Sequence, residues 1–385
     1  MFYFWEMIYI EKYKAGQFRK GIQYQYFIPE KINDAWCWQN PELNDLLEKA
    51  AIKLGELNSF SRFVLNIDLF IQIHVTKEAV VSSRIEGTQT NMNEALLPET
   101  EIKPEKRNDW KEVNNYIRAM NSAVAALKSL PLSGRLLKQT HAILLDSVRG
   151  EYKSPGSYRT SQNWIGGLSL SDAAFIPPHH DLVNELMSDL EHFLHNDGIH
   201  LPELIKIAIA HYQFETIHPF LDGNGRIGRL LITLYLVSKN ILDKPLLYLS
   251  TFFEKNKSLY YDNLTRVRTH NDMMHWVKYF LVGVVQTATQ AASTLQEVLQ
   301  LKTETESLIQ TKFGRRSNTG MALLQSLLKN PMITVDEAAK KTKLTYKAAN
   351  NLIELMVTHN ILRETTGQSR NRIFVFDAYL DAFVK

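Results

Sequence analysis

The sequence predicts a mainly α-helical protein with a small β-hairpin and a separate module at its C-terminal end. Apolar residues recur at three- and four-residue spacing through several long segments, which is the periodicity of one helix face. Strand signals are few and short, and after residue 312 the pattern changes to short helices followed by strand-like runs. With 45% apolar and 22% charged residues, the chain has enough apolar material for a sizeable core.

Three consecutive helices are expected in the middle of the chain, at residues 182–197, 203–214 and 226–238. For the first, we place Asp181 as the N-cap and Gly198 as the stop. Its predicted apolar face consists of Leu182, Val183, Leu186, Met187, Leu190, Phe193 and Leu194. The second segment is apolar on most sides, which predicts a buried central helix.

A β-hairpin is expected just before these helices. Two short apolar runs, residues 163–167 and 174–176, flank the polar stretch 168–172, and Pro177 and Pro178 end the pattern. This hairpin is the clearest strand signal before the C-terminal module.

The C-terminal module has its own sequence of elements. A long helix is expected over residues 284–311 and a linker over 313–318. Thr334 and Glu337 then form a capping-box pattern, and Thr345 opens another helix. Strand-like runs at 361–363 and 372–376 surround a polar turn. Helices followed by a hairpin in this order indicate a winged helix-turn-helix at residues 313–385.

Composition limits the classes of protein that need be considered. Cys37 is the single cysteine, so no disulfide within the chain and no cysteine metal cluster are expected, and a cytoplasmic location fits. Residues 1–10 are apolar, but Glu6 interrupts them, and we do not expect a signal peptide. No apolar run reaches the roughly 18 residues of a transmembrane helix.

Residues 222–229 carry the strongest functional pattern, because three glycines and two arginines lie between two predicted helices. Glycine tolerates positive φ, so successive N–H groups can point into one concavity, and the following helix adds its N-terminal N–H groups. Arg226 and Arg229 are three residues apart and therefore share one face of that helix. This arrangement predicts a polyphosphate-binding site.

Two further side chains next to this loop predict group transfer. The imidazole of His218 titrates near neutrality and is suited to deprotonate an attacking hydroxyl. The carboxylate of Asp222 is a hard oxygen ligand of the kind that holds Mg²⁺ beside phosphates. Base, metal ligand and anion site thus lie within twelve residues, which favours phosphoryl or nucleotidyl transfer.

The same glycines also match a dinucleotide-binding fingerprint. Gly223, Gly225 and Gly228 satisfy G-x-G-x-x-G, with Asp243 near the position of the acidic residue. That motif requires a strand leading directly into the first glycine. Here the preceding segment is helical and contains Pro219, so we disfavour this interpretation.

The run from His218 to Arg229 resembles the signature of the Fic family, H-P-F-x-[D/E]-G-N-G-R-x-x-R, without a departure. Similarity extends to residues 155–159 and 163–178 before this run, and to Tyr260, Tyr261 and Trp276 after it. The resemblance implies a helical core with the hairpin as a flap over the site, ATP and Mg²⁺ as substrate and cofactor, and transfer of AMP to a protein hydroxyl. It further implies that His218 is the base and that Asp222 holds the metal.

The resemblance also assigns the remaining loop residues. It implies that Gly223, Asn224 and Gly225 form an anion hole and that Arg226 and Arg229 contact the β- and γ-phosphates. Phe220 is expected to be an apolar plug under the loop, and the flap is expected to pair with an extended segment of the target protein.

A second element, Ser82 to Gly87, is similar to the family's inhibitory motif, [S/T]-x-x-x-E-[G/N]. Gly87 fits a C-cap, which places Glu86 at a helix C-terminus, where the dipole disfavours a carboxylate and a cation should compensate. The resemblance implies that this cation is Arg229. A Glu86–Arg229 pair would then occupy the place of the γ-phosphate.

We therefore divide the chain into an N-terminal helical region with the inhibitory helix (1–110), a catalytic core (111–285), a linker helix (286–312) and the winged helix-turn-helix (313–385).

Expected partners are a protein with an exposed Ser, Thr or Tyr hydroxyl, DNA or protein at the winged helix, and a second copy in a homodimer; no membrane partner is expected. Two alternatives remain open: a nucleotide-sensing transcriptional regulator, and a related enzyme that transfers UMP or removes AMP. Arg84 and Arg159 are expected to form ordinary salt bridges.

Overall fold

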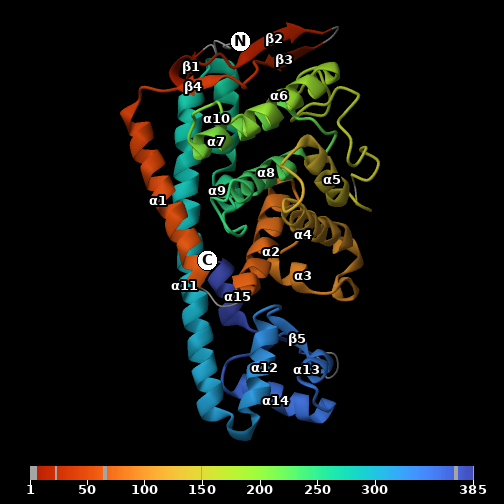
Figure 1. The fold of residues 1–385 in the computed structure, drawn as a ribbon. Coiled ribbons are helices and arrows are strands. Elements are labelled where there is room, and N and C mark those ends of the chain that lie inside the picture. Colours follow the sequence, from red (N-terminus) through yellow and green to blue (C-terminus); the bar gives the residue numbers. More distant parts are fainter. Residues whose placement is uncertain (1–6, 22–23, 64–66, 149, 368–371, 385) are drawn as a thin grey trace.

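The long helix α11 (Met273–Lys312) runs the length of the molecule in the computed structural model, with α1 (Pro41–Phe63) beside it (Figure 1). The structure describes residues 7–21, 24–63, 67–148, 150–367 and 372–384. Residues 1–6 lie outside this description; they belong to the apolar N-terminal segment that we do not expect to be a signal peptide. Residues 368–371, most of the predicted polar turn, also lie outside it. Among the described residues, no helix combines the length and apolar character needed to cross a membrane.

The three central helices are confirmed as α6 (Val183–His195), α7 (Glu203–Ile217) and α8 (Asn224–Ser238). Every residue of α7 from Leu204 to Ile217 is buried, as its apolar surface predicted. The prediction of Asp181 as N-cap is wrong. A short 3-10 helix, η4 (His180–Leu182), precedes α6 and makes Leu182 the N-cap, while the Asp181 carboxylate contacts His179 and His180.

The N-terminal region is not helical throughout, which corrects the expectation for residues 1–110. β1 (Met7–Tyr9) pairs in parallel with β4 (Ala35–Cys37), and β2 (Gly16–Lys20) pairs antiparallel with β3 (Gln25–Pro29). β3 contains the consecutive aromatic and β-branched residues Tyr26, Phe27 and Ile28, types that favour a strand. The 3-10 helix η1 (Ile10–Lys12) follows β1.

The helices around the central three come from widely separated segments. α2 (Ile67–Ile85) and α4 (Arg107–Ala126) pack together on one side, with α3 (Met92–Leu96) and the 3-10 helices η2 (Glu99–Glu101) and η3 (Pro104–Lys106) between them in sequence. α5 (Gly134–Leu144) packs against α4. α9 (Ser250–Lys255) packs against α2, and α10 (Lys257–His270) leads into α11.

The expected division at residue 285 falls inside α11, which is one continuous helix. Its buried face continues across that point through Val284, Ala288, Ala291 and Leu295, and no glycine or proline after Gly283 interrupts it. The linker expected at 313–318 is a 3-10 helix, η5 (Gly314–Arg316), followed directly by α12.

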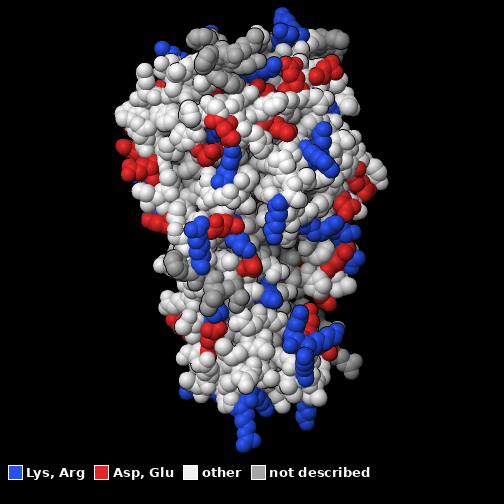
Figure 2. Space-filling model, in the orientation of Figure 1, with Lys and Arg blue, Asp and Glu red and all other residues white. Residues whose placement is uncertain are grey.

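The C-terminal elements are α12 (Ser317–Leu327), β5 (Met332–Thr334), α13 (Val335–Thr342), α14 (Tyr346–Thr358), β6 (Arg363–Glu364), β7 (Ile373–Val375) and α15 (Asp377–Val384). The capping box of Thr334 and Glu337 and the Thr345 cap are confirmed. The antiparallel sheet has the order β5-β7-β6. β5 and α15 were not predicted, and the assignment as a winged helix-turn-helix stays a prediction. Figure 2 shows Lys and Arg side chains projecting from this end of the molecule.

The last helix, α15, returns to the N-terminal half and packs against α2 and α11. The ring of Phe383 is fully buried, with its centroid 5.1 Å from that of Phe70 on α2 and 5.4 Å from that of Tyr379. The C-terminal module is therefore attached to α2 through a buried aromatic contact.

We predict that Phe383→Ala lowers the free energy of unfolding by about 3 kcal/mol, because it leaves a cavity in place of a buried ring. Val384→Ala, at the neighbouring exposed residue, should change it by less than about 0.5 kcal/mol. Urea unfolding followed by circular dichroism measures both. Equal effects of the two substitutions would contradict the docking of α15.

Candidate functional site

His218 lies where α7 ends. It adopts the left-handed conformation, with φ 50° and ψ 61°, and its N–H donates to the Phe214 carbonyl at 2.9 Å. Its own carbonyl accepts hydrogen bonds from Arg159 Nε at 3.0 Å and Asn163 Nδ2 at 3.2 Å. The backbone of the predicted base is thus fixed by residues at the start of the flap.

The expected salt bridge of Arg159 is wrong. Among the described residues its buried guanidinium has no acidic partner and instead donates to the carbonyls of Ser161, Pro178, Ile217 and His218. Carbonyl oxygens satisfy the donors of a buried cation where a carboxylate is missing. Arg84, by contrast, does pair with Glu254, at 3.2 Å.

The loop after His218 is closed by Asn224. Its side-chain oxygen accepts from the Phe220 N–H and its amide donates to the Phe220 carbonyl, both at 2.8 Å. Phe220 is fully buried, as the plug under the loop was predicted to be. Because the Asn224 side chain is engaged in this way, its backbone N–H is the group that faces a ligand in the first turn of α8.

His141 on α5 supports the loop from below and was missed in the sequence. Its ring stacks on Phe220, with centroids 3.9 Å apart and planes 10° apart. Nδ1 accepts from the Gly156 N–H at 2.9 Å, so Nε2 carries the hydrogen and donates to the Asp222 carbonyl at 2.9 Å. Burial lowers the pKa of His141 to about 4, which keeps the ring neutral. No local pattern marks this residue, because its contacts arise only on folding.

The predicted metal ligand and the first arginine lie together. The side chain of Asp222 is 43% exposed, and its Oδ1 accepts from the Gly223 N–H at 2.6 Å and lies 3.5 Å from the guanidinium of Arg226. Arg226 is buried and pairs with Glu112 of α4 at 3.2 Å. Glu112 was also missed, because it lies 114 residues from Arg226 in sequence.

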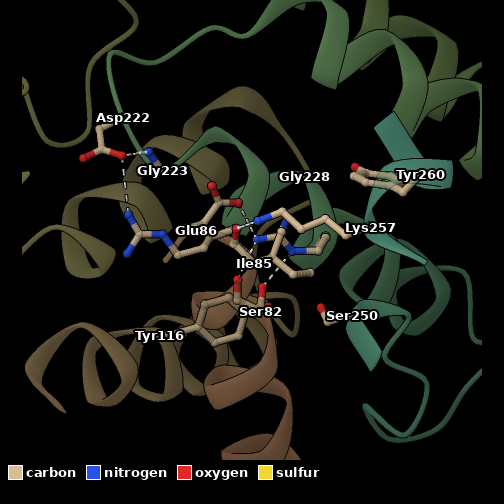
Figure 3. A network of polar contacts seen from close by, with 12 residues as sticks. Ser82, Ile85, Glu86, Tyr116, Asp222, Gly223, Gly228, Ser250, Lys257 and Tyr260 are labelled. Carbon is tan, nitrogen blue, oxygen red and sulfur yellow. Dashed lines mark hydrogen bonds and ion pairs between the residues drawn. The ribbon is translucent and has the colours of Figure 1, made fainter. Parts of the chain in front are cut away.

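Arg229 is held by the predicted inhibitory residues (Figure 3). Its guanidinium donates to Glu86 Oε1 at 2.7 Å, and to the hydroxyl and the carbonyl of Ser82, both at 2.8 Å. Burial works against the charges, but the mutual attraction prevails: it lowers the pKa of Glu86 and raises that of Arg229. Gly87, at φ 105°, directs the chain away after α2.

The Glu86 carboxylate also lies against the glycine loop. A methyl group built on Gly225 would lie 2.3 Å from Glu86 Oε1 and 2.9 Å from Arg229, so only glycine permits this approach. The carboxylate of Glu86 thus lies beside the N-terminal turn of α8 and binds the buried Arg229 of that helix. This is the environment that a phosphate group requires.

Two more contacts, neither predicted, hold the C-terminal part of α2. Lys257 donates to the Ile85 carbonyl at 2.7 Å, which places a second cation at the end of the helix. One turn before Ser82, the buried Glu78 accepts hydrogen bonds from Tyr116 at 2.9 Å and from Ser250 at 2.5 Å.

The flap is more open than an extended hairpin. A single bridge, Ile165 with Phe175, joins its two sides, and Asp172 accepts the N–H groups of Leu168 and Ser169 at the turn. Leu168 is 93% exposed. The Ile176 carbonyl accepts the Phe27 N–H of β3 at 3.0 Å, so the N-terminal hairpin adjoins the flap.

Gly228 makes room for a buried carboxyl group behind the site. A methyl group there would lie 2.1 Å from Oε1 of Glu215. We predict that Gly228→Ala destabilises the fold by about 1–3 kcal/mol through overpacking. Gly55→Ala, inside α1 with no atom within 4 Å, should instead stabilise it by about 0.5–1 kcal/mol. Urea midpoints measure both, and stabilisation by Gly228→Ala would contradict this packing.

Comparison with known proteins agrees with this arrangement. Residues 44–125 match the model described as Fic/DOC family N-terminal, and residues 131–236 match that of the Fic/DOC family. Protein adenylyltransferase fic-1 of Caenorhabditis briggsae is 30% identical over 165 residues, 40% of this chain and 30% of the relative. A probable protein adenylyltransferase of Aquifex aeolicus is 37% identical over 92 residues, 24% of this chain and 27% of the relative. The chain thus spans less than a third of these relatives.

Solved structures share the fold. A Fic family protein from Desulfovibrio desulfuricans G20 superposes with a TM-score of 0.54 at 19% identity, covering 88% of this chain and 96% of that one. A Fic domain-containing signaling protein from Bacteroides thetaiotaomicron superposes with a TM-score of 0.52 at 20% identity, covering 64% and 96%. At these identities the likeness shows a common helical fold. The present structure excludes the dinucleotide-binding interpretation, because a helix, α7, and not a strand leads into the loop.

Proposed function

We propose that this chain, which belongs to the Fic/DOC family, transfers AMP from ATP to a Ser, Thr or Tyr hydroxyl of a protein and is inhibited by its own Glu86. The observation that carries the proposal is the anion site at the start of α8, where Arg229 already binds a carboxylate beside Gly225. The naming of the relatives as protein adenylyltransferases supports the same activity.

The site residues suit each part of this reaction. The N–H groups of the first turn of α8 would bind the phosphates, with Arg226 on the β-phosphate and Arg229 on the γ-phosphate. The half-exposed carboxylate of Asp222 fits Mg²⁺, which neutralises phosphate charge when bound. Burial lowers the pKa of His218 to about 3, so the ring is neutral near pH 7 and has a lone pair available. The negative charge of bound phosphates would raise this pKa and thereby favour uptake of the hydroxyl proton.

The chemical step replaces a phosphoanhydride bond of ATP with a phosphodiester bond to the target. The target hydroxyl oxygen forms a bond with the α-phosphorus, and the bond from that phosphorus to the bridging oxygen of the β-phosphate breaks. The hydroxyl proton passes to His218, and pyrophosphate leaves. The flap would hold the target segment in place by strand addition.

Inhibition follows from competition for one cation. Arg229 is buried and already bound to Glu86 and Ser82, so a γ-phosphate reaches it only when the Glu86 carboxylate moves away. The side chain of Glu86 is 33% exposed, which leaves it a path into solvent.

We predict that Glu86→Gly raises self-modification and target modification by about tenfold or more, because it frees Arg229 for ATP. Incubation with α-labelled ATP, alone and in cell lysate, measures the incorporated label. Glu101→Gly, at an exposed acid outside the site, serves as the control and should leave incorporation unchanged. An unchanged rate in Glu86→Gly would contradict the inhibitory role.

His218→Ala, made in the Glu86→Gly background, should reduce transfer by a factor of about 10²–10⁴, the usual contribution of a general base. Nucleotide affinity should remain similar, because the phosphates are bound by other groups. Label incorporation and equilibrium ATP binding separate the two effects. His270→Ala, at an exposed histidine, is the matched control. Full activity without the imidazole would refute the assignment.

The proposed contacts of this site are with the phosphates of the nucleotide, which ATP and UTP share. The same assay with labelled UTP therefore tests transfer of UMP as the alternative. Release of AMP from a modified target tests the reverse activity. Contact of residues 313–385 with DNA or protein, a homodimer and a cytoplasmic location stay predictions. A transcriptional regulator is disfavoured, because sensing of a nucleotide needs neither His218 nor Asp222.

A further inference from the structure

A cavity of about 140 Å³ lies beside the inhibitory helix, between α2, α9 and α11. None of its lining residues belongs to the loop from His218 to Arg229, so it is separate from the proposed ATP site. His74, Lys77 and Glu78 contribute the α2 wall, and Lys255 and Gln290 line it from α9 and α11.

Two cations line this cavity, and the carboxylate beside them, that of Glu78, is hydrogen-bonded to Tyr116 and Ser250 and forms no ion pair with either lysine. Neither Lys77 nor Lys255 has a carboxylate within ion-pair distance in the described part of the chain. Burial and the charge of Lys255 together lower the pKa of Lys77. Two neighbouring ammonium groups repel each other, and a bound anion would relieve that repulsion.

Two nearly fully buried polar atoms on α2 also lack partners. His74 is 8% exposed, and its Nε2 lies 3.0 Å from the Leu246 carbonyl, so Nε2 carries the hydrogen and Nδ1 is an acceptor without a donor. Glu78 is 3% exposed, and its Oε1 accepts from Tyr116 and Ser250 while Oε2 has no partner in the described structure. A buried polar atom left unpaired destabilises the fold.

We propose that this cavity binds a small organic anion that carries a hydroxyl group, and that its occupant holds α2 in the inhibitory position. The carboxylate or phosphate of the ligand pairs with Lys77 and Lys255. Its hydroxyl donates to His74 Nδ1 once the ring turns toward the cavity, because this atom has almost no accessible surface in the present arrangement. The volume limits the ligand, because a cavity of about 150 Å³ accommodates a molecule the size of benzene. A three- or four-carbon compound therefore fits, with its charged end at the mouth.

The link to inhibition rests on the proposed function and on the geometry of α2. Glu78, Ser82 and Glu86 follow one another at four-residue spacing, so the cavity wall and the Arg229 contacts belong to one face of one helix. On the opposite wall, Lys255 lies two residues before Lys257, which binds the Ile85 carbonyl. A ligand that joins these walls stabilises the arrangement in which Glu86 meets Arg229.

Binding is tested first, on the full chain and without any measurement of transfer. Isothermal titration calorimetry compares malate with succinate, and glycerol 3-phosphate with propyl phosphate, pairs in which the second member lacks the hydroxyl. We expect one hydroxy anion to bind about fivefold or more tightly than its partner without the hydroxyl. The two pairs distinguish a carboxylate from a phosphate ligand. Failure of both hydroxy anions to bind overturns the proposal.

Variants then test whether the anion binds in this cavity. Lys77→Met and Lys255→Met should each weaken it by about tenfold or more, because each removes one charged hydrogen bond. Ala291→Leu, which fills the cavity and keeps both charges, should abolish it. Lys302→Met, further along α11 in a surface ion pair with Glu306, is the control and should bind as the wild type does. Unchanged binding in Ala291→Leu overturns the location.

Coupling between the anion in the cavity and the Glu86–Arg229 contact is tested by measuring ATP binding. Because no transfer of AMP is measured, a negative result is distinct from failure of the catalytic proposal. With Mg²⁺ in excess, the bound hydroxy anion should weaken ATP binding to the wild-type chain and leave it unchanged in Glu86→Gly, where no inhibitory contact remains to be stabilised. Tight binding of the anion with unaltered ATP affinity would overturn the regulatory link.

Discussion

The ion pair between Glu86 and Arg229 is the contact on which the rest of the site depends. The Arg229 side chain is only 2% exposed, and a buried charge that loses its partner destabilises a protein by several kcal/mol. Any state in which Glu86 leaves must therefore supply another anion, and in the proposed mechanism the terminal phosphate of a nucleotide would do so. Inhibition and substrate binding would then be two ways of meeting one electrostatic requirement.

The same requirement explains how the loop is anchored. Arg226 finds Glu112 on α4, and Arg159 finds backbone carbonyls from the flap and from the end of α7. Burial raises the pKa of Glu215 to about 7, against the opposing influence of Arg229. Because Arg226 and Arg159 find their partners on different elements, the loop is held in place from several directions at once.

The inhibitory helix is likewise held by segments that are far apart in sequence. Lys257 binds its last turn, Tyr116 and Ser250 bind its middle through Glu78, and Phe383 of the C-terminal helix packs on Phe70 near its start. These contacts connect the helix that leads to Glu86 with α4, α9, α10 and α15. The position of this carboxylate is thus a property of the whole molecule.

Local chemistry was readable from the sequence. The helices α7 and α8 and the capping box of Thr334 were predicted and are confirmed, because periodicity and capping act over a few residues. The anion-binding character of residues 222–229 stays a prediction. The roles assigned to single site residues came from the family resemblance and remain proposals.

Tertiary structure decided what no local pattern encodes. The parallel pairing of β1 with β4, the support from His141 and Glu112, and the carbonyl contacts of Arg159 depend on partners brought together by folding. Spacing alone does not pair Glu86 with Arg229 across 143 positions of sequence. Sequence determined which groups carry charge and which segments are helical; only packing decided which charges are buried, and burial is what obliges each of them to find a partner.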